Sequence, residues 1–160
     1  MPITAMRSLN KEIWIMVLQN RGIRRTAATF LLLAATATAC ADEALTARNK
    51  AIVADFYTTV MIGRNVDAAP RFLSTGYLQH SGNMPSGRQA FVDEFRANFA
   101  RKLPPDYKRE ILRVVGDNDI VILFNRQSGT DDQGKHRLVL QFDMFRVDNG
   151  VIVEHWDADT

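Results

Sequence analysis

Apolar residues recur every three or four positions in the first part of the chain, which is the spacing of a helix with one buried face. Asp42 can cap the first such segment, and Gly63 is a natural stop for it. Residues 65–73 predict a short second helix with Phe72 and Leu73 turned inward. The predicted stripe of the first helix consists of Leu45, Ile52, Val53, Phe56, Tyr57, Val60 and Met61.

A third helix is predicted to open at Ser86, which forms a capping box with Gln89. Phe91, Phe95 and Phe99 recur along it at every fourth position, and Pro104-Pro105 ends it. Before this helix, residues 77–80 form a short extended segment that leads into a Gly/Pro loop.

The rest of the chain has the pattern of β-strands, predicted at residues 107–115, 120–127, 136–147 and 151–157. Asp148-Asn149-Gly150 is a strong hairpin turn, because Asn-Gly accommodates two positive φ angles. Helices followed by an antiparallel meander predict an α+β domain with the helices against one face of the sheet. The last two strands are mostly apolar on both sides, as in a sheet covered on both faces.

Alternation assigns residues of the last two strands to faces. Gln141, Asp143 and Phe145 share one face of their strand. In the final strand, Val151, Val153, His155 and Asp157 share one face and Ile152, Glu154 and Trp156 the other. Asp143 is a carboxylate in an apolar run, where burial without a partner is costly. It is either an acid or base placed in an apolar pocket, or a buried Asp neutralised by Arg126, Arg146 or His155.

Residues 16–41 have the composition of an export signal. Arg21, Arg24 and Arg25 precede an uncharged run of 14 residues, 26–39, and small residues around Ala39 fit a cleavage site. A buried helix of the fold is the alternative, and the arginine pair also permits a twin-arginine reading. Cys40 stands where a bacterial lipoprotein carries its acylated cysteine. We therefore expect an N-terminal extension and signal peptide at 1–41, a folded domain at 42–160, and export to the periplasm or medium, with membrane attachment only through the signal or Cys40.

Charge and motifs exclude several classes of function. Five of the 20 Lys/Arg and one of the 18 Asp/Glu lie in residues 1–41, so residues 42–160 have a net charge of −2 and no basic face for nucleic acid. The three histidines have no metal-ligand spacing, and no Gly-rich phosphate loop or G-x-S-x-G motif occurs. We therefore expect neither a metal nor a cofactor.

Two stretches resemble the SnoaL-like family. Tyr77-Leu78-Gln79-His80, with the loop after it and Gly87-Arg88-Gln89-Ala90-Phe91, is similar to the family's Y-x-Q-H-N-P…G-x-x-x-F segment. Residues 143–157, DMFRVDNGVIVEHWD, resemble the family's D-I-F-R-V-x-x-G-K-I-V-E-H-W-D ending. The resemblance covers about residues 47–157. It implies the cone-shaped nuclear transport factor 2-like fold, with helices packed in a curved antiparallel sheet, and often a homodimer.

The resemblance also implies a function. Polyketide cyclases of the family catalyse an aldol condensation without metal or cofactor, using an Asp in a hydrophobic cavity, and Asp143 falls at that position. We expect Asp143 to act as general base, His155 as its partner or proton shuttle, and His80 with Tyr77 to polarise a carbonyl of a small substrate. The other residues expected to contact substrate are Gln79, Phe124, Arg126, Gln141 and Asp157.

Two alternatives remain open. Many relatives carry an H-x-H pair on the second long strand, whereas this chain has Leu123-Phe124-Asn125-Arg126 there. An exported protein that binds an apolar ligand without turnover would fit this departure. A structural dimer module, whose cone interior is filled by side chains, is the third hypothesis.

Overall fold

The computed structural model describes residues 40–82 and 84–157. The signal-peptide prediction falls on residues outside that range, apart from Cys40 and Ala41. One compact unit begins at Glu43 and contains all the strands. None of the helices in the described residues is long and apolar enough to cross a membrane.

The first helix is described over residues 40–56 and continues as a π-helical segment, η1 (Tyr57–Ile62). Gly63 ends it, as predicted, and its backbone N–H bonds to Thr58 O at 2.9 Å. A side chain at Gly63 would lie 2.7 Å from the carbonyl oxygen of Thr59, so close approach rather than a positive φ favours glycine here. Val53, Phe56 and Val60 of the predicted stripe are buried, but Leu45 is 43% exposed.

The second predicted helix is a short 3-10 helix, η2 (Val66–Arg71), and Phe72 and Leu73 after it are buried as predicted. Helix α2 (Arg88–Ala100) begins at Gly87 without a side-chain cap, so the predicted capping box does not form. The hydroxyl oxygen of Ser86 instead accepts a hydrogen bond from the backbone N–H of Gln79 at 3.0 Å. This bond ties the loop to strand β1 (Leu73–Gln79).

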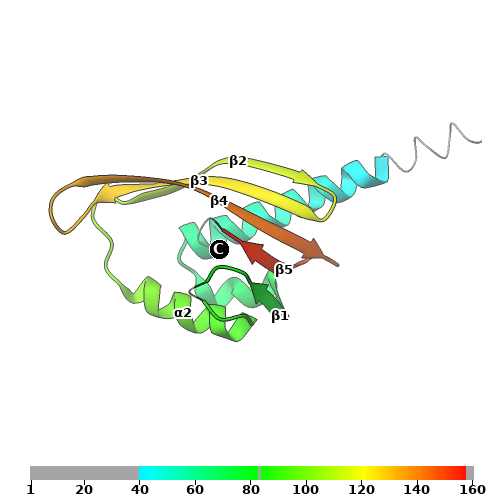
Figure 1. Cartoon of the computed structure of the whole chain (residues 1–160), viewed down its shortest axis with the longest axis horizontal. Coiled ribbons are helices and arrows are strands. Elements are labelled where there is room, and N and C mark those ends of the chain that lie inside the picture. The colour runs from blue at the N-terminus through cyan, green and yellow to red at the C-terminus, as the bar shows by residue number, and fades with distance from the viewer. Residues whose placement is uncertain (1–39, 83, 158–160) are drawn as a thin grey trace, which may run out of the picture. The chain divides into compact units, whose positions relative to one another are not determined.

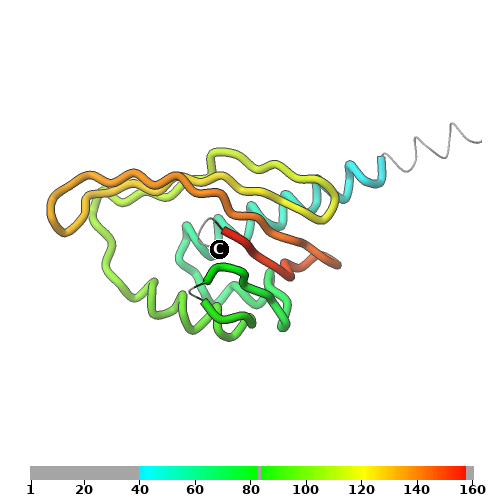
Figure 2. Tube along the Cα trace, in the orientation of Figure 1, coloured from blue at the N-terminus to red at the C-terminus, as the bar shows by residue number. Residues whose placement is uncertain are grey.

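Four further strands follow, as the alternation predicted: β2 (Lys108–Asp117), β3 (Ile120–Thr130), β4 (His136–Asp148) and β5 (Val151–Trp156). They form one sheet in the order β1-β5-β4-β3-β2, antiparallel except that β1 pairs with β5 in parallel. Asn149 and Gly150 both have positive φ in the turn between β4 and β5. Figure 1 shows the helices on one side of the sheet, and the Cα trace in Figure 2 shows the sheet bending so that β5 and β1 turn towards them.

The core lies between the helices and the concave face of the sheet. Phe56 of the first helix is at its centre, with ring centroids 5.8 Å from Phe72 and 5.9 Å from both Phe91 and Phe145. Edge-to-face and tilted pairs of this kind contribute beyond their buried area. These rings therefore fix η2, α2 and β4 around the end of the first helix.

A β-bulge in β5 corrects the predicted faces of that strand. Arg146 pairs with Glu154 and Val147 pairs with Ile152, so Val153 is an extra residue without a partner on β4. Ile152 and His155 are consequently both buried on the concave side, and Ile152 does not share a face with Glu154 as strict alternation predicted. The extra residue thus changes which side chains of β5 face inward: the alternation before Val153 is offset by one residue from the alternation after it.

The convex face of the sheet has an apolar area that no other described residue covers, which corrects the prediction of a sheet covered on both sides. Leu138, Leu140 and Phe142 of β4 are 59%, 55% and 59% exposed. The rings of Phe142 and Phe124 stack at 4.4 Å on this face.

Candidate functional site

A cavity of about 190 Å³ opens between the helices and the concave face of the sheet. Its apolar wall comes mainly from the first helix and α2: Phe56, Met61, Phe91 and Phe95. The opposite wall carries polar groups from β1, β2, β4 and β5. Those that the argument uses are Gln79, Arg109, Gln141, Asp143, His155 and Asp157.

Asp143 is 5% exposed, and every neighbour that bonds to its carboxylate is a donor or can be one. Asn125 Nδ2 donates to Oδ2 at 2.7 Å and Gln141 Nε2 to Oδ1 at 3.2 Å. The charge of this carboxylate also acts on the nearby Tyr57 hydroxyl. Both carboxylate oxygens therefore have hydrogen-bond partners inside an otherwise apolar cavity.

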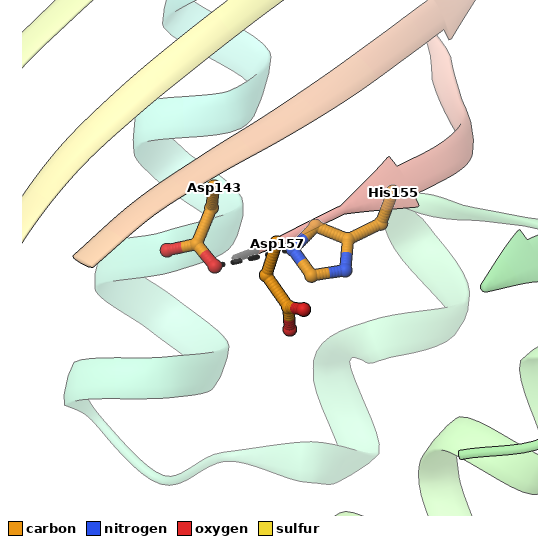
Figure 3. Close-up of side chains that lie close together, drawn as sticks. All are labelled: Asp143, His155 and Asp157. Carbon is orange, nitrogen blue, oxygen red and sulfur yellow. Dashed lines mark hydrogen bonds and ion pairs between the residues drawn. The ribbon is translucent and has the colours of Figure 1, made fainter. Parts of the chain in front are cut away.

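His155 completes the set of partners of Asp143, and Figure 3 shows the contact between the two side chains. The two ring nitrogens of His155 have different partners. Nε2 lies 3.1 Å from Asp143 Oδ1, and Nδ1 lies 2.8 Å from Gln79 Oε1. An amide oxygen only accepts, so Nδ1 carries a hydrogen. The contact between Nε2 and Asp143 then also needs one proton, held either by an imidazolium that faces a carboxylate or by a carboxylic acid that faces a neutral imidazole. The pair is therefore a one-proton unit.

Gln79 reaches His155 because β1 and β5 run in parallel, with Gln79 directly paired to His155. The amide of Gln79 is itself held in place. Its Oε1 accepts a hydrogen bond from the Tyr77 hydroxyl at 2.9 Å, and its Nε2 donates to Ser81 Oγ at 2.6 Å. These contacts orient the amide so that its oxygen faces the imidazole, which fixes the tautomer.

A second chain of hydrogen bonds approaches Asp143 along the sheet. The Tyr107 hydroxyl donates to Gln127 Oε1 at 3.1 Å, and Gln127 Nε2 donates to Gln141 Oε1 at 3.2 Å. Gln141 then donates to Asp143. All three donors point the same way, towards the carboxylate, and aligned hydrogen bonds strengthen one another.

Burial, and then the negative charge of Asp143, raise the pKa of Tyr57 far above its usual value. Burial does the same for Tyr77, followed by the charges of Asp143 and Asp157. Both phenols therefore keep their protons throughout the pH range in which proteins are folded. Tyr57 can act as a hydrogen-bond donor in the cavity but not as a base.

A family model for the SnoaL-like polyketide cyclases matches residues 51–159, which is most of the chain. The chain belongs to the SnoaL-like family. A comparison with curated proteins finds no match.

Solved structures agree with this fold, which is of the nuclear transport factor 2-like type. TsrD from Streptomyces laurentii superposes with a TM-score of 0.58 at 17% identity, over 69% of this chain and 87% of that one. Bal32a, from a soil-derived mobile gene cassette, gives 0.58 at 18%, over 71% and 89%. An LEH-like epoxide hydrolase from M. tuberculosis gives 0.55 at 15%, over 70% and 82%. At these identities the likeness establishes the fold alone.

Within this SnoaL-like domain, the structure gathers most of the predicted site residues around one cavity. Asp143, His155, Tyr77, Gln79, Gln141 and Asp157 all line it. The first four form a continuous hydrogen-bonded set.

Three predicted residues lie elsewhere, for two reasons. His80 points to the other side of the sheet edge, where its ring stacks on Trp156 at 4.5 Å and Nε2 pairs with Glu154 at 2.9 Å. Phe124 and Arg126 flank the inward-facing Asn125 and so point outward, Phe124 to Phe142 and Arg126 to Glu110. The structure thus does not bring these side chains to the cavity.

The residues of the site that were not predicted include Tyr57 and Arg109, which line the cavity, and Asn125, which donates to Asp143. Tyr57 looked like one more apolar position of the first helix, and its place in a π-helical segment has no sequence signal. The sequence held a signal for Asn125, because it lies in the stretch Leu123-Phe124-Asn125-Arg126 that corresponds to the H-x-H pair of many relatives. Arg109 lies in a strand with four other basic and acidic residues, and composition does not single it out.

Asp157 brings a second carboxylate to the pair. One ligand atom from each of Asp143, His155 and Asp157 lies within 4.8 Å of the others, close enough for a cation to reach all three (Figure 3). The sequence prediction of no metal rested on the spacing of the three histidines, whereas this group contains one histidine and two carboxylates. Both nitrogens of His155 are already engaged by Asp143 and Gln79, so metal binding through Nε2 would require the His155–Asp143 contact to break.

Proposed function

We propose that this SnoaL-like protein is a cofactor-independent acid–base enzyme that acts on a small carbonyl compound. The observation that carries the proposal is the buried one-proton pair of Asp143 and His155 in the wall of an otherwise apolar cavity. An Asp with only a structural role could equally well be neutralised by an arginine. Here a carboxylate and an imidazole are held by oriented amides and left in contact with space for a ligand.

In this proposal Asp143 removes a proton from the carbon beside the carbonyl group. The electron pair of that C–H bond forms the enolate, and the negative charge moves to the carbonyl oxygen. The Tyr57 hydroxyl is a donor next to Asp143 and would stabilise that oxygen. The proton then returns from the pair to oxygen or carbon, so the enzyme ends as it began. A positioned base of this kind contributes roughly 10²–10⁴-fold.

The size of the cavity favours a small ligand over a multi-ring polyketide. Pockets for drug-sized ligands have volumes of about 300–1,000 Å³, and this one has about 190 Å³. The aromatic and methionine side chains of the opposite wall would contact an apolar part of the substrate.

Proton exchange tests the proposal without knowledge of the full reaction. The purified chain would be mixed in D₂O with a panel of small ketones, keto acids and β-dicarbonyl compounds, and loss of the α-proton signal followed by NMR. Acceleration over buffer for at least one member of the panel is expected. A protein that binds a panel compound and releases it with all α-protons retained would be a binding protein, the second candidate, which the absent H-x-H pair favours.

We also propose that the protein forms a homodimer through the convex sheet face. The support is the apolar surface of Leu138, Leu140 and Phe142, since monomers rarely expose large contiguous apolar patches. A second copy has the same apolar surface to offer, as in a two-fold interface.

Export remains a further proposal, supported by the composition of residues 16–41 alone. Cell fractionation and mass spectrometry of the mature N-terminus would test it. A terminus beginning near Asp42 would indicate ordinary cleavage, an acylated Cys40 would indicate a lipoprotein, and a cytoplasmic protein that keeps residues 1–41 would refute export.

A further inference from the structure

Arg109 differs from three of the other arginines of the sheet in what its guanidinium contacts, and from the fourth, Arg113, in that Arg113 is exposed to solvent. Arg126 pairs with Glu110 at 2.6 Å, Arg137 pairs with Asp131 at 2.6 Å, and Arg146 pairs with Glu154. Within the described residues Arg109 makes neither an ion pair nor a side-chain hydrogen bond. Its Nε is fully buried and has no partner.

Alternation along β2 explains why Arg109 lacks a carboxylate. Its neighbour Glu110 faces the convex side, where it serves Arg126, while Arg109 faces the concave side and lines the cavity. A buried guanidinium N–H without an acceptor is costly, and in most native proteins such a group has a partner. The cavity is where that partner would come from.

Tyr57 places Arg109 relative to the catalytic pair. The guanidinium carbon of Arg109 lies 5.9 Å from the centre of the Tyr57 ring, and the hydroxyl of the same tyrosine is close enough to Asp143 to feel its charge. All three residues line the cavity. Arg109 and Asp143 are not themselves in ion-pair contact. A ligand that extends along Tyr57 would therefore have its one end at a cation and its other end at the Asp143–His155 pair.

We infer that the substrate is a small carboxylic acid, whose carboxylate binds Arg109 while its reacting carbon lies at Asp143. This rests on the proposed function and adds the substrate class to it. The planar guanidinium matches a carboxylate in shape and charge. A phosphate dianion is disfavoured, because Arg109 is the one arginine or lysine that lines this cavity in the described chain, and Asp143 and Asp157 line it too.

Matched probes that differ only in charge test the inference. 3-Phenylpropionate and 3-phenylpropionamide have nearly the same shape. Butyrate and butyramide are a smaller matched pair, for use if the phenyl compounds do not fit the cavity. Binding to the purified full chain would be measured by ligand-observed NMR titration. We expect the carboxylate to bind at least about 10-fold more tightly than its amide, as a charge-assisted hydrogen bond allows.

Variants assign any preference to Arg109. Arg109→Gln is expected to abolish the preference for carboxylate and leave amide binding unchanged, and Arg109→Lys to keep part of it. Arg113→Gln is the matched control, since Arg113 lies on the same strand and is exposed; it removes the same charge and should keep the full preference. Thermal melts would check that each variant folds.

Three results would overturn the inference: equal binding of acid and amide, no binding of any carboxylate probe, or an equal loss in Arg113→Gln. The failure of the proposed function looks different. A carboxylate preference that depends on Arg109, without exchange of any α-proton, would sink the enzyme proposal and keep the binding site. Exchange that depends on Asp143, without a carboxylate preference, would keep the enzyme proposal and refute the carboxylate site at Arg109.

Discussion

Replacing Asp143 by Asn tests the proposed mechanism, because the change keeps the shape of the side chain and removes its ability to accept a proton. In the variant the side-chain oxygen can still accept from Asn125 Nδ2, now 2.7 Å from Oδ2. The new NH₂ group can donate to Nε2 of a neutral His155, now 3.1 Å from Oδ1. The weaker contact from Gln141, at 3.2 Å to the same Oδ1, is then a donor facing a donor.

One lost hydrogen bond of this kind costs about 1–2 kcal/mol of unfolding free energy. For a domain of this size that is roughly 4–8 °C in melting temperature. The effect on chemistry is expected to be much larger. Loss of the general base should lower α-proton exchange by roughly 10²–10⁴-fold, or about 2.7–5.4 kcal/mol of transition-state stabilisation.

The assay is α-proton exchange in D₂O by NMR, with thermal unfolding followed in parallel. Asp148→Asn is the matched control, since Asp148 ends the same strand and is exposed. It should change neither quantity appreciably. Full exchange activity in Asp143→Asn would refute the assignment of the base, and an unfolded variant would leave Asp143→Glu, which keeps the carboxylate, to be compared for partial activity.

Four other perturbations have defined outcomes. Gln79→Leu removes the acceptor for His155 Nδ1 and should slow exchange about tenfold without abolishing binding of the probe acids. The hydrogen bond from His80, followed by Arg146, lowers the pKa of Glu154 below its ordinary 4.5, so its stabilising effect is present above that pH and lost as pH falls through the folded-state pKa. Glu154→Gln should therefore lower the melting temperature at neutral pH, and the difference from wild type should vanish in acid. Phe142→Glu should convert a dimer to monomers in analytical ultracentrifugation; an unchanged mass would place the interface elsewhere or show a monomer. Chelation with EDTA should leave exchange unchanged, and a loss restored by a divalent cation would instead assign one to Asp143, His155 and Asp157.

Much of the fold follows from local patterns. The π-helical segment aside, the order of helices and strands was predictable from the spacing of apolar residues, and the Asn149-Gly150 turn from backbone conformation. The parallel pairing of β1 with β5 was not, because it joins segments more than 70 residues apart and depends on where the bent sheet places its last strand. The bulge at Val153 also escaped prediction, since nothing in a run of Val and Ile marks which one is the extra residue.

The candidate site divides in the same way. Asp143 and His155 were identifiable as polar residues in apolar strands, and the family resemblance pointed to both. Arg109 and Tyr57 were not, because their importance comes from what they lack or touch in three dimensions: a missing counter-ion for one, a contact with Asp143 for the other. His80 was misplaced since a residue one position beyond the inward-facing Gln79 points the other way.

The bulge in β5 means that the strand contains one residue more than its pairing with β4 requires. Val153 has no partner on β4, and a regular ladder would pair Ile152 with Val147 and Glu154 with Arg146 in its absence. Deleting Val153 would therefore keep Ile152 in the core and His155 in the cavity, because the residues that are left would pair in a regular ladder. For laboratory evolution Val153 therefore marks a place where β5 can be shortened by one residue while Ile152 and His155 both keep facing the concave side of the sheet.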